Sequence, residues 1–295
     1  MAGAEMAERL GSIELQTRAA FMLAQERLDR DDVAGIPGID ETLKLARQLN
    51  TSTAVLSKFV IVSDLLALGE VAAACDLHAE ARDQAEDLQL YTYSKGLEQQ
   101  KTSLAFVTGD WASARTGAEQ APRTGDRTAF ASGDVLGDET NIAIRAALNL
   151  TDGAIDEALI DAQRAVDVIS AGTYEVPIVL ALAAFVFAEC SNTERSSHLI
   201  NQWIDVLKRL RRVYPTSFGW PLLAWAAYRV GRREEIARHL DTPRVQTPWI
   251  HCARTVATRE PKPAIAQLEA MGALGIARLI TSAIAARASV AEQGG

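Results

Sequence analysis

The sequence has 295 residues, 48 % of them hydrophobic and 6 % aromatic, and a formal net charge of −8. A chain of this length can bury a sizeable core, and its acidity argues against a general nucleic-acid binder without excluding a local basic surface. Three dispersed cysteines provide no disulfide framework, so we expect a reducing, cytoplasmic setting. No basic start followed by an apolar run is present, so no secretion signal is expected.

One turn motif recurs along the chain and organises the rest. Its clearest copy begins at Gly153 and reads GAIDEALIDAQRAVDV. The glycine can adopt positive φ where one helix stops, and Asp156 and Glu157 then place negative charge in the first turn of the next helix. One helix face carries small residues, which let a neighbouring helix approach closely, at Ala158, Ala162 and Ala165. We expect most of the opposite face to meet water, at Asp161, Gln163, Arg164 and Asp167.

The motif repeats at nearly constant spacing. Copies begin at Asp31, Gly69, Gly109, Gly153, Ser191 and Gly231, at intervals of 38, 40, 44, 38 and 40 residues. A second marker, the leucine near a helix end, recurs every 39 residues at Leu10, Leu49 and Leu88. In the copy that begins at Gly109, Ala114 occupies the same small-residue position as Ala158. A fixed period of this size is typical of an α-solenoid built from helical hairpins.

The segments GAIDEALIDAQRAV and GDWASA resemble the tetratricopeptide (TPR) superfamily. The period is longer than the ~34 residues usual in that family, so each hairpin has extra helical turns. Long, alanine-rich repeats of this kind resemble the C-terminal region of bacterial signalling ATPases, including adenylate-cyclase-linked and LuxR-type regulators. The resemblance implies an all-α, right-handed solenoid and a role in signalling or transcription control.

The resulting assignment is one domain over residues 1–295, with six to seven hairpins and a C-terminal capping helix. The helices are predicted, in chain order, at 12–29, 37–49, 53–68, 70–88, 91–108, 110–121, 135–150, 154–170, 174–190, 193–213, 220–230, 233–240, a short hairpin within 248–271, and 274–290. Residues 122–134 are rich in Thr, Ser, Gly and Asp and are predicted to form the longest loop, a possible insertion.

The N-terminal end has two interpretations. Residues 5–11 resemble the tail of a second helix, so the chain could begin inside a repeat, as part of a longer ancestral protein, or present a docking surface. Either interpretation predicts unusual apolar exposure and possible self-association at this end. The residues expected along this face are Leu10, Leu15, Ala19 and Met22.

Other candidate features have simpler explanations. Residues 176–190 are strongly apolar, but the run is shorter than the ~20 residues of a membrane span and contains Glu189, so a buried central helix is expected. Cys75 and His78 could supply half of a metal site, but no second ligand pair at zinc spacing follows. Phosphate-binding glycine loops and nucleophile elbows are missing from the sequence. We therefore expect no cofactor, no metal and no enzymatic activity.

One segment departs from the acidic average. Residues 203–240 hold eight Lys or Arg against three acids, whereas residues 1–90 hold eight basic and sixteen acidic residues. The candidate partner-binding residues are Lys208, Arg209, Arg211, Arg212, Trp220, Trp225, Arg229, Arg232 and Arg233. They predict an acidic protein or peptide partner, although solvated charges and core tryptophans would give the same pattern.

The leading hypothesis is a non-enzymatic interaction or sensor module that binds partners along a concave surface lined by the first helices of the hairpins. The alternative is a small-molecule receptor with a pocket inside the superhelix. An extended polar groove would favour the first hypothesis, and an enclosed apolar pocket with a few convergent polar groups would favour the second.

Overall fold

The computed structural model describes residues 2–120, 138–169, 176–210, 218–258 and 261–293, and these residues form an all-α fold without strands. The helices are α1 (Ala2–Arg9), α2 (Ile13–Asp29), the 3-10 turn η1 (Val33–Gly35), α3 (Ile36–Ala46), α4 (Ser52–Leu68), α5 (Val71–Asp87), α6 (Tyr91–Thr108), α7 (Trp111–Glu119), α9 (Asp138–Thr151), α10 (Ile155–Val168), α11 (Val176–Glu189), α12 (Thr193–Leu210), α13 (Gly219–Arg229), α14 (Arg233–Leu240), α15 (Pro248–Thr258), α16 (Lys262–Ala270) and α17 (Leu274–Gln293). The predicted ranges agree closely with these bounds. The predicted loop at 122–134 lies outside the described residues.

The predicted turns have the expected backbone conformation. All six positions where the turn motif begins have positive φ, from 56° to 89°: Asp31, Gly69, Gly109, Gly153, Ser191 and Gly231. Glycine adopts this conformation without a steric penalty, and aspartate and serine do so because the turn requires it. At the third copy, the Asp110 side chain then accepts a hydrogen bond from the Ser113 N–H and caps α7. The second helix of each hairpin therefore begins where the sequence predicts.

The small-residue face is buried as predicted. Ala114, Ala158 and Ala165 are fully buried, where the two helices of a hairpin pack together. Asp161, which was expected to face water, is buried as well. The Arg145 guanidinium donates to both of its carboxylate oxygens at 2.8 Å, and the Asn149 side chain donates at 3.1 Å. A buried carboxylate is tolerated here because it is paired with a cation and hydrogen-bonded.

The first helices of successive hairpins lie inside the molecule and contact one another in chain order. These inner helices are α4, α6, α9, α11, α13 and α15. The predicted central helix is confirmed, since nearly every side chain of α11 is buried, and α13 is buried from Gly219 to Ala227. A large apolar cluster runs through this interior, with the rings of Phe106, Phe218 and Trp249 in edge contact.

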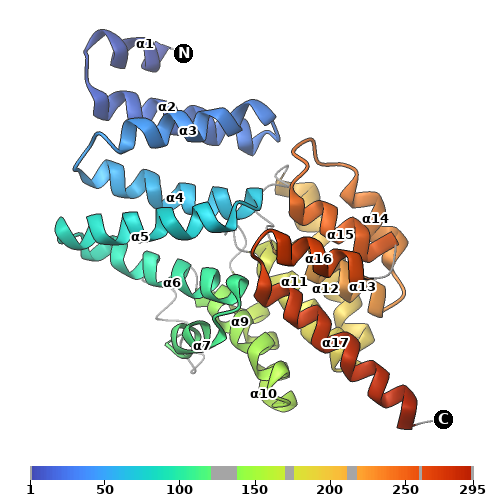
Figure 1. The fold of residues 1–295 in the computed structure, drawn as a ribbon. Helices are drawn as coiled ribbons and strands as arrows, with labels where there is room; N and C mark the ends of the chain where they lie inside the picture. The colour runs from blue at the N-terminus through green and yellow to red at the C-terminus, as the bar shows by residue number, and fades with distance from the viewer. Residues whose placement is uncertain (1, 121–137, 170–175, 211–217, 259–260, 294–295) are drawn as a thin grey trace.

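The C-terminal helices pack back against the N-terminal half (Figure 1). Helix α15 contacts α4, where the Trp249 indole N–H donates to the Leu66 carbonyl at 2.6 Å, and α17 contacts α6. The Arg278 guanidinium donates to the Gly109 carbonyl at 3.0 Å. The concave surface predicted to bind partners is therefore not open along α11 and α13, because neighbouring helices cover those side chains.

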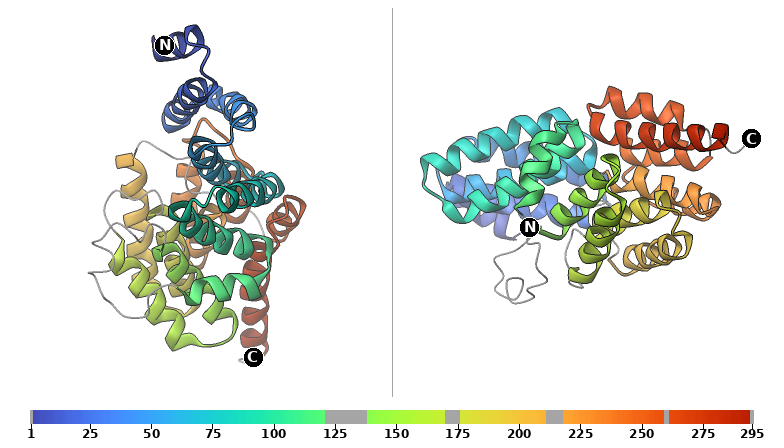
Figure 2. Two further views of the ribbon diagram at one scale, coloured as in Figure 1. Left: turned by 90° about the vertical axis from the view of Figure 1, so that its left-hand side faces the viewer. Right: turned by 90° about the horizontal axis from the view of Figure 1, so that it is seen from below.

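The N-terminal helices lie at an end of the described chain and expose apolar side chains. Figures 1 and 2 show α1 and α2 at one extremity, remote from the C-terminus. Leu10, Leu15 and Met22 are exposed and Ala19 is half-buried, so the predicted apolar exposure is confirmed.

Candidate functional site

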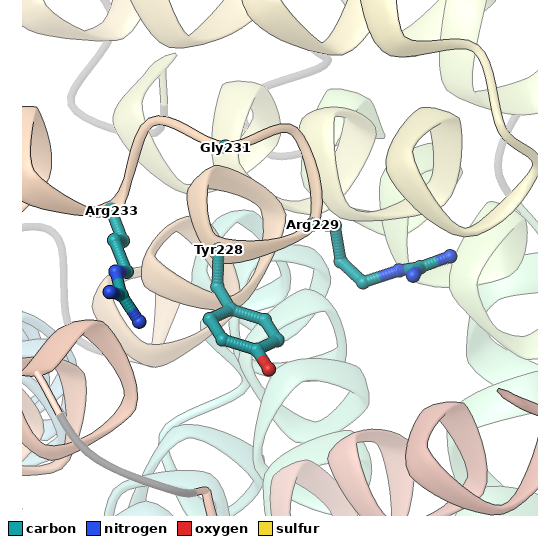
Figure 3. Close-up of a pocket in the computed structure, with 4 residues that line it drawn as sticks. All are labelled: Tyr228, Arg229, Gly231 and Arg233. Atoms are coloured by element: carbon teal, nitrogen blue, oxygen red, sulfur yellow. The ribbon is translucent and has the colours of Figure 1, made fainter. Parts of the chain in front are cut away.

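A shallow hollow lies at the turn that joins α13 to α14, within the basic segment predicted from the sequence. It has a volume of about 310 Å³ and is lined by Tyr228, Arg229, Gly231 and Arg233 (Figure 3). Gly231 forms the turn with φ of 76°. Figure 3 shows the Tyr228 ring and the Arg233 side chain extending to the same side of this turn, whereas Arg229 extends away from them. Tyr228 and Arg233 therefore line the hollow with a hydroxyl and a guanidinium.

The Tyr228 ring is held in place from the core. It stacks on Trp225 with ring centroids 5.5 Å apart. The Trp225 indole N–H donates to a Glu189 carboxylate oxygen at 2.8 Å, and the Arg229 Nε donates to the same oxygen at 2.7 Å. Glu189 and Arg229 are largely buried, so their ion pair fastens α11 to α13. The charge of Arg229 is compensated within the fold.

Arg232 joins two outer helices. Its Nη1 donates to the Ser197 carbonyl at 2.7 Å and its Nη2 to the Asn201 side chain at 2.6 Å, both on α12. Its Nε donates to the Glu235 carboxylate on α14 at 2.8 Å. Five donors in a planar fork suit arginine to such a junction. Arg232 thus holds α12 beside the start of α14.

The remaining cations lie on the outer surface of these two helices. Arg233 is exposed and has no ion pair among the described residues. Lys208 on α12 is exposed, and its 3.6 Å contact with Asp205 is a surface pair of little strength. Burial lowers the pKa of His239 on α14, and the nearby positive charge of Lys208 lowers it further. Lys208 therefore lies near His239, toward the end of α14.

The structure divides the nine predicted residues into four groups. Lys208 and Arg233 are exposed on α12 and α14, whose outer side we call the α12–α14 surface, and Arg232 joins the two helices. Trp220 and Trp225 are only 1 % exposed, so their assignment to a binding surface is wrong. They belong to an inner helix, where Trp220 packs edge-on against Trp203 and Trp225 supports Tyr228. Arg229 is engaged by Glu189. The Arg209 side chain, Arg211 and Arg212 lie outside what the structure describes.

Two relevant residues were missed by the sequence reasoning, although a signal for one of them was present. Glu189 and Arg229 are 40 residues apart, which is one repeat, and opposite charges at that spacing predict an ion pair between equivalent positions of neighbouring hairpins. Tyr228 ends an apolar run in the sequence, at residues 222–228, and its position at the hollow depends on the turn that follows. Residue spacing alone does not show whether a tyrosine here is buried in the core or lies at the hollow.

Other polar clusters in the described part of the chain act as ties within the fold. The buried Lys58 ammonium contacts the Glu80 carboxylate at 2.6 Å and donates to the Gln84 side chain at 2.8 Å. The His78 ring Nε2 hydrogen-bonds to the Leu97 carbonyl at 2.8 Å. Among the described residues, no group of three or more His, Cys, Asp or Glu is arranged to hold a metal ion.

Within the same described ranges, no helix combines the length and apolarity that a membrane crossing requires. A scan against protein-family models and a search of curated proteins each found no match. The α12–α14 surface and its hollow are therefore interpreted from their own chemistry.

Proposed function

We propose that this chain is a non-enzymatic, TPR-like interaction or sensor module, a right-handed α-solenoid of six to seven hairpins that acts in the cytoplasm in bacterial signalling or transcription control. The recurring turns with positive φ and the buried alanine face support the repeat assignment. The resemblance of GAIDEALIDAQRAV and GDWASA to TPR repeats and to regulator C-terminal regions supports the biological setting. Three free cysteines agree with a reducing compartment.

The observation that carries the proposed binding function is the hollow at the α13–α14 turn. Tyr228 and Arg233 offer hydrogen-bond donors on the same side, and Lys208 adds a second exposed positive charge on α12. Guanidinium groups bind carboxylates through charge-assisted hydrogen bonds. An acidic segment of a protein or peptide is the partner that these groups fit best, with a carboxylate at Arg233 and a further acid near Lys208.

The frame around this surface favours recognition without large rearrangement. Tyr228 is stacked on a buried tryptophan, and Arg232 fixes α12 to α14 through three hydrogen bonds. A binding group that is already held in place loses less conformational entropy when the partner arrives. The acidic partner therefore meets a preformed surface.

The small-molecule receptor hypothesis has weaker support. It requires a pocket inside the superhelix, but nearly all side chains of α11 and α13 are buried against other helices. The described hollow is on the outside, and its volume is at the lower limit of small-molecule pockets, which are ~300–1,000 Å³. Protein or peptide recognition at an outer surface is the better fit.

A random-peptide display selection tests the proposal without knowledge of the natural partner. We expect the unmodified protein to enrich Asp- and Glu-rich peptides and Arg233→Glu to lose that enrichment. Lys44→Glu is the matched control, because it makes the same charge change at an exposed position on α3. Apolar or basic peptides from the unmodified protein, or equal enrichment by both variants, would refute acidic recognition at this surface.

A further inference from the structure

Exposed apolar side chains are concentrated at the N-terminal extremity. Of eleven large hydrophobic residues that are exposed in the described chain, six lie within residues 6–33. These six are Met6, Leu10, Ile13, Leu15, Met22 and Val33. A contiguous apolar patch on a soluble protein indicates an interaction surface, whereas single exposed hydrophobic residues are ordinary. These residues do not all share one face, so the candidate surface is the set of exposed apolar residues that lies on a single face of α2.

Helix α2 buries one face and exposes apolar side chains on the opposite face. Thr17, Ala24 and Leu28 are buried toward the rest of the molecule. Leu15, Ala19 and Met22 follow one another at i, i+4 and i+7, which places them on one stripe of the opposite face. We call these three residues the α2 stripe. Leu15 and Met22 are exposed, Met22 by 69 %, and the smaller Ala19 lies between them.

The neighbours of α2 explain why this stripe is uncovered. The inner helix α4 packs between α2 on one side and α6 on the other. Helix α2 packs on α4 and α3, and it also contacts the 3-10 turn η1 and the short helix α1. The α2 stripe is therefore uncovered, whereas the equivalent face of the first helix in the next hairpin is covered by another helix.

The charges beside the stripe permit contact between identical surfaces. Residues 13–30 hold three acidic and three basic residues, and two i,i+4 ion pairs join Glu14 to Arg18 at 3.0 Å and Glu26 to Arg30 at 2.7 Å. Helix α5, by comparison, carries five acids and one arginine. In a chain of net charge −8, most self-contacts would bring like charges together, and the neutral α2 surface does not.

We propose that the α2 stripe is the contact surface for a second copy of this chain. The two α2 helices run antiparallel about a two-fold axis near Ala19, so that Leu15 of each copy packs against Met22 of the other. Leu15 lies four residues before Ala19 and Met22 three residues after it, so a two-fold rotation near Ala19 nearly exchanges the two large side chains. The stripe is therefore close to self-complementary. Ala19 permits close approach at the crossing point, and Met6 of α1 and Leu10, which follows α1, extend the apolar contact. The contact is independent of the α12–α14 surface.

Sedimentation equilibrium over a concentration series provides the first test. The unmodified protein should form a dimer, and the double variant Leu15→Glu/Met22→Glu should raise the dimer dissociation constant by ~100-fold or more, because four apolar side chains at the contact, two in each copy, become charged. The control is Ile160→Glu, at a 59 % exposed position on α10. It should dimerise like the unmodified protein. A monomer at all concentrations, or a dimer that the double variant leaves intact with its helical content unchanged, would overturn the proposal.

Cysteine cross-linking tests the geometry. Ala19→Cys, in a background with Cys75→Ala and Cys190→Ala, should give a covalent dimer on mild oxidation, since Cα atoms near the axis fall within the ~4.4–6.8 Å range of a disulfide. A mixture of Leu15→Cys and Met22→Cys proteins should cross-link to each other, and neither should cross-link alone. Efficient Leu15→Cys self-cross-linking would show a parallel arrangement and overturn the antiparallel contact, even if a dimer forms.

Discussion

Replacing Gly275 with alanine tests the packing of α17 against α6. A Cβ atom on Gly275 would lie 1.8 Å from the carbonyl oxygen of Phe106 and 3.0 Å from the indole nitrogen of Trp111. The obstructing atom belongs to the backbone of a buried segment, so a side-chain rotation cannot relieve the clash. Helix α17 must move away by more than 1 Å, as judged from ordinary carbon–oxygen contacts of ~3.3 Å or longer.

The magnitude follows from three opposing contributions to the free energy of unfolding. Alanine for glycine inside a helix stabilises by up to ~1 kcal/mol. Overpacking costs ~1–3 kcal/mol. The displacement also weakens the bond from Arg278 to the Gly109 carbonyl and the contact of Arg278 with the Trp111 ring, together ~1–2 kcal/mol. We expect a net destabilisation of about 2 kcal/mol, opposite in sign to helix propensity alone.

Urea denaturation gives the stability change, and hydrogen exchange locates it. Gly275→Ala should lower the unfolding midpoint and increase exchange in α6 and α17. The matched control is Gly153→Ala, at a turn with φ of 77° and no neighbouring atom within 4 Å. It should cost ~1–2 kcal/mol through backbone strain and leave exchange in α6 and α17 unchanged. A Gly275→Ala protein as stable as the unmodified one would refute the described packing of α17 on α6.

Two further predictions concern the core. Ala158→Leu should overpack the contact between α9 and α10 and cost ~1–3 kcal/mol in urea denaturation, and an unchanged unfolding curve would contradict the register built on Gly153. Burial lowers the pKa of His78 below its ordinary value of 6.5, so the unfolded chain binds more protons as the pH falls through that value. Stability should therefore be constant above about pH 7 and decrease toward acid, with a shallower decrease in His78→Gln. Part of the decrease in stability toward acid should remain in His78→Gln, because the pKa of His239 is also lowered. Identical pH profiles of stability for the unmodified protein and His78→Gln would contradict a burial effect at His78.

The local structure was predictable because it depends on residues close together in sequence. Glycine can adopt positive φ, so the turns are predicted from the glycines at positions 69, 109, 153 and 231. The alanine spacing identifies the packed face. The repeat interval added Asp31 and Ser191, which would be ambiguous alone. Helix bounds followed from these positions.

The contacts that close the molecule could not be predicted in this way. Gly275 and Phe106, or Trp249 and Leu66, are more than 160 residues apart, and no periodic signal links them. The sequence also could not show whether a polar side chain faces water or the interior. Asp161 looked like a solvated residue until the structure placed Arg145 beside it.

The candidate surface was only partly predictable, because contacts between helices decide which of its residues are exposed. Composition identifies the basic segment, but it cannot separate Arg229, which pairs with Glu189, from Arg233, which is exposed. It also cannot show that Trp225 acts from the core by supporting Tyr228. Those distinctions depend on which helix lies next to each residue.

The most direct measurement of the central claim is the affinity for a selected acidic peptide over a salt series, by fluorescence anisotropy. We predict that affinity falls as ionic strength rises, because exposed charges are screened over ~8–10 Å. We also predict that Lys208→Glu and Arg233→Glu each weaken binding about tenfold or more at low salt, and that Lys44→Glu does not. Salt-independent binding, or equal weakening by all three substitutions, would contradict recognition of an acidic partner at the α12–α14 surface.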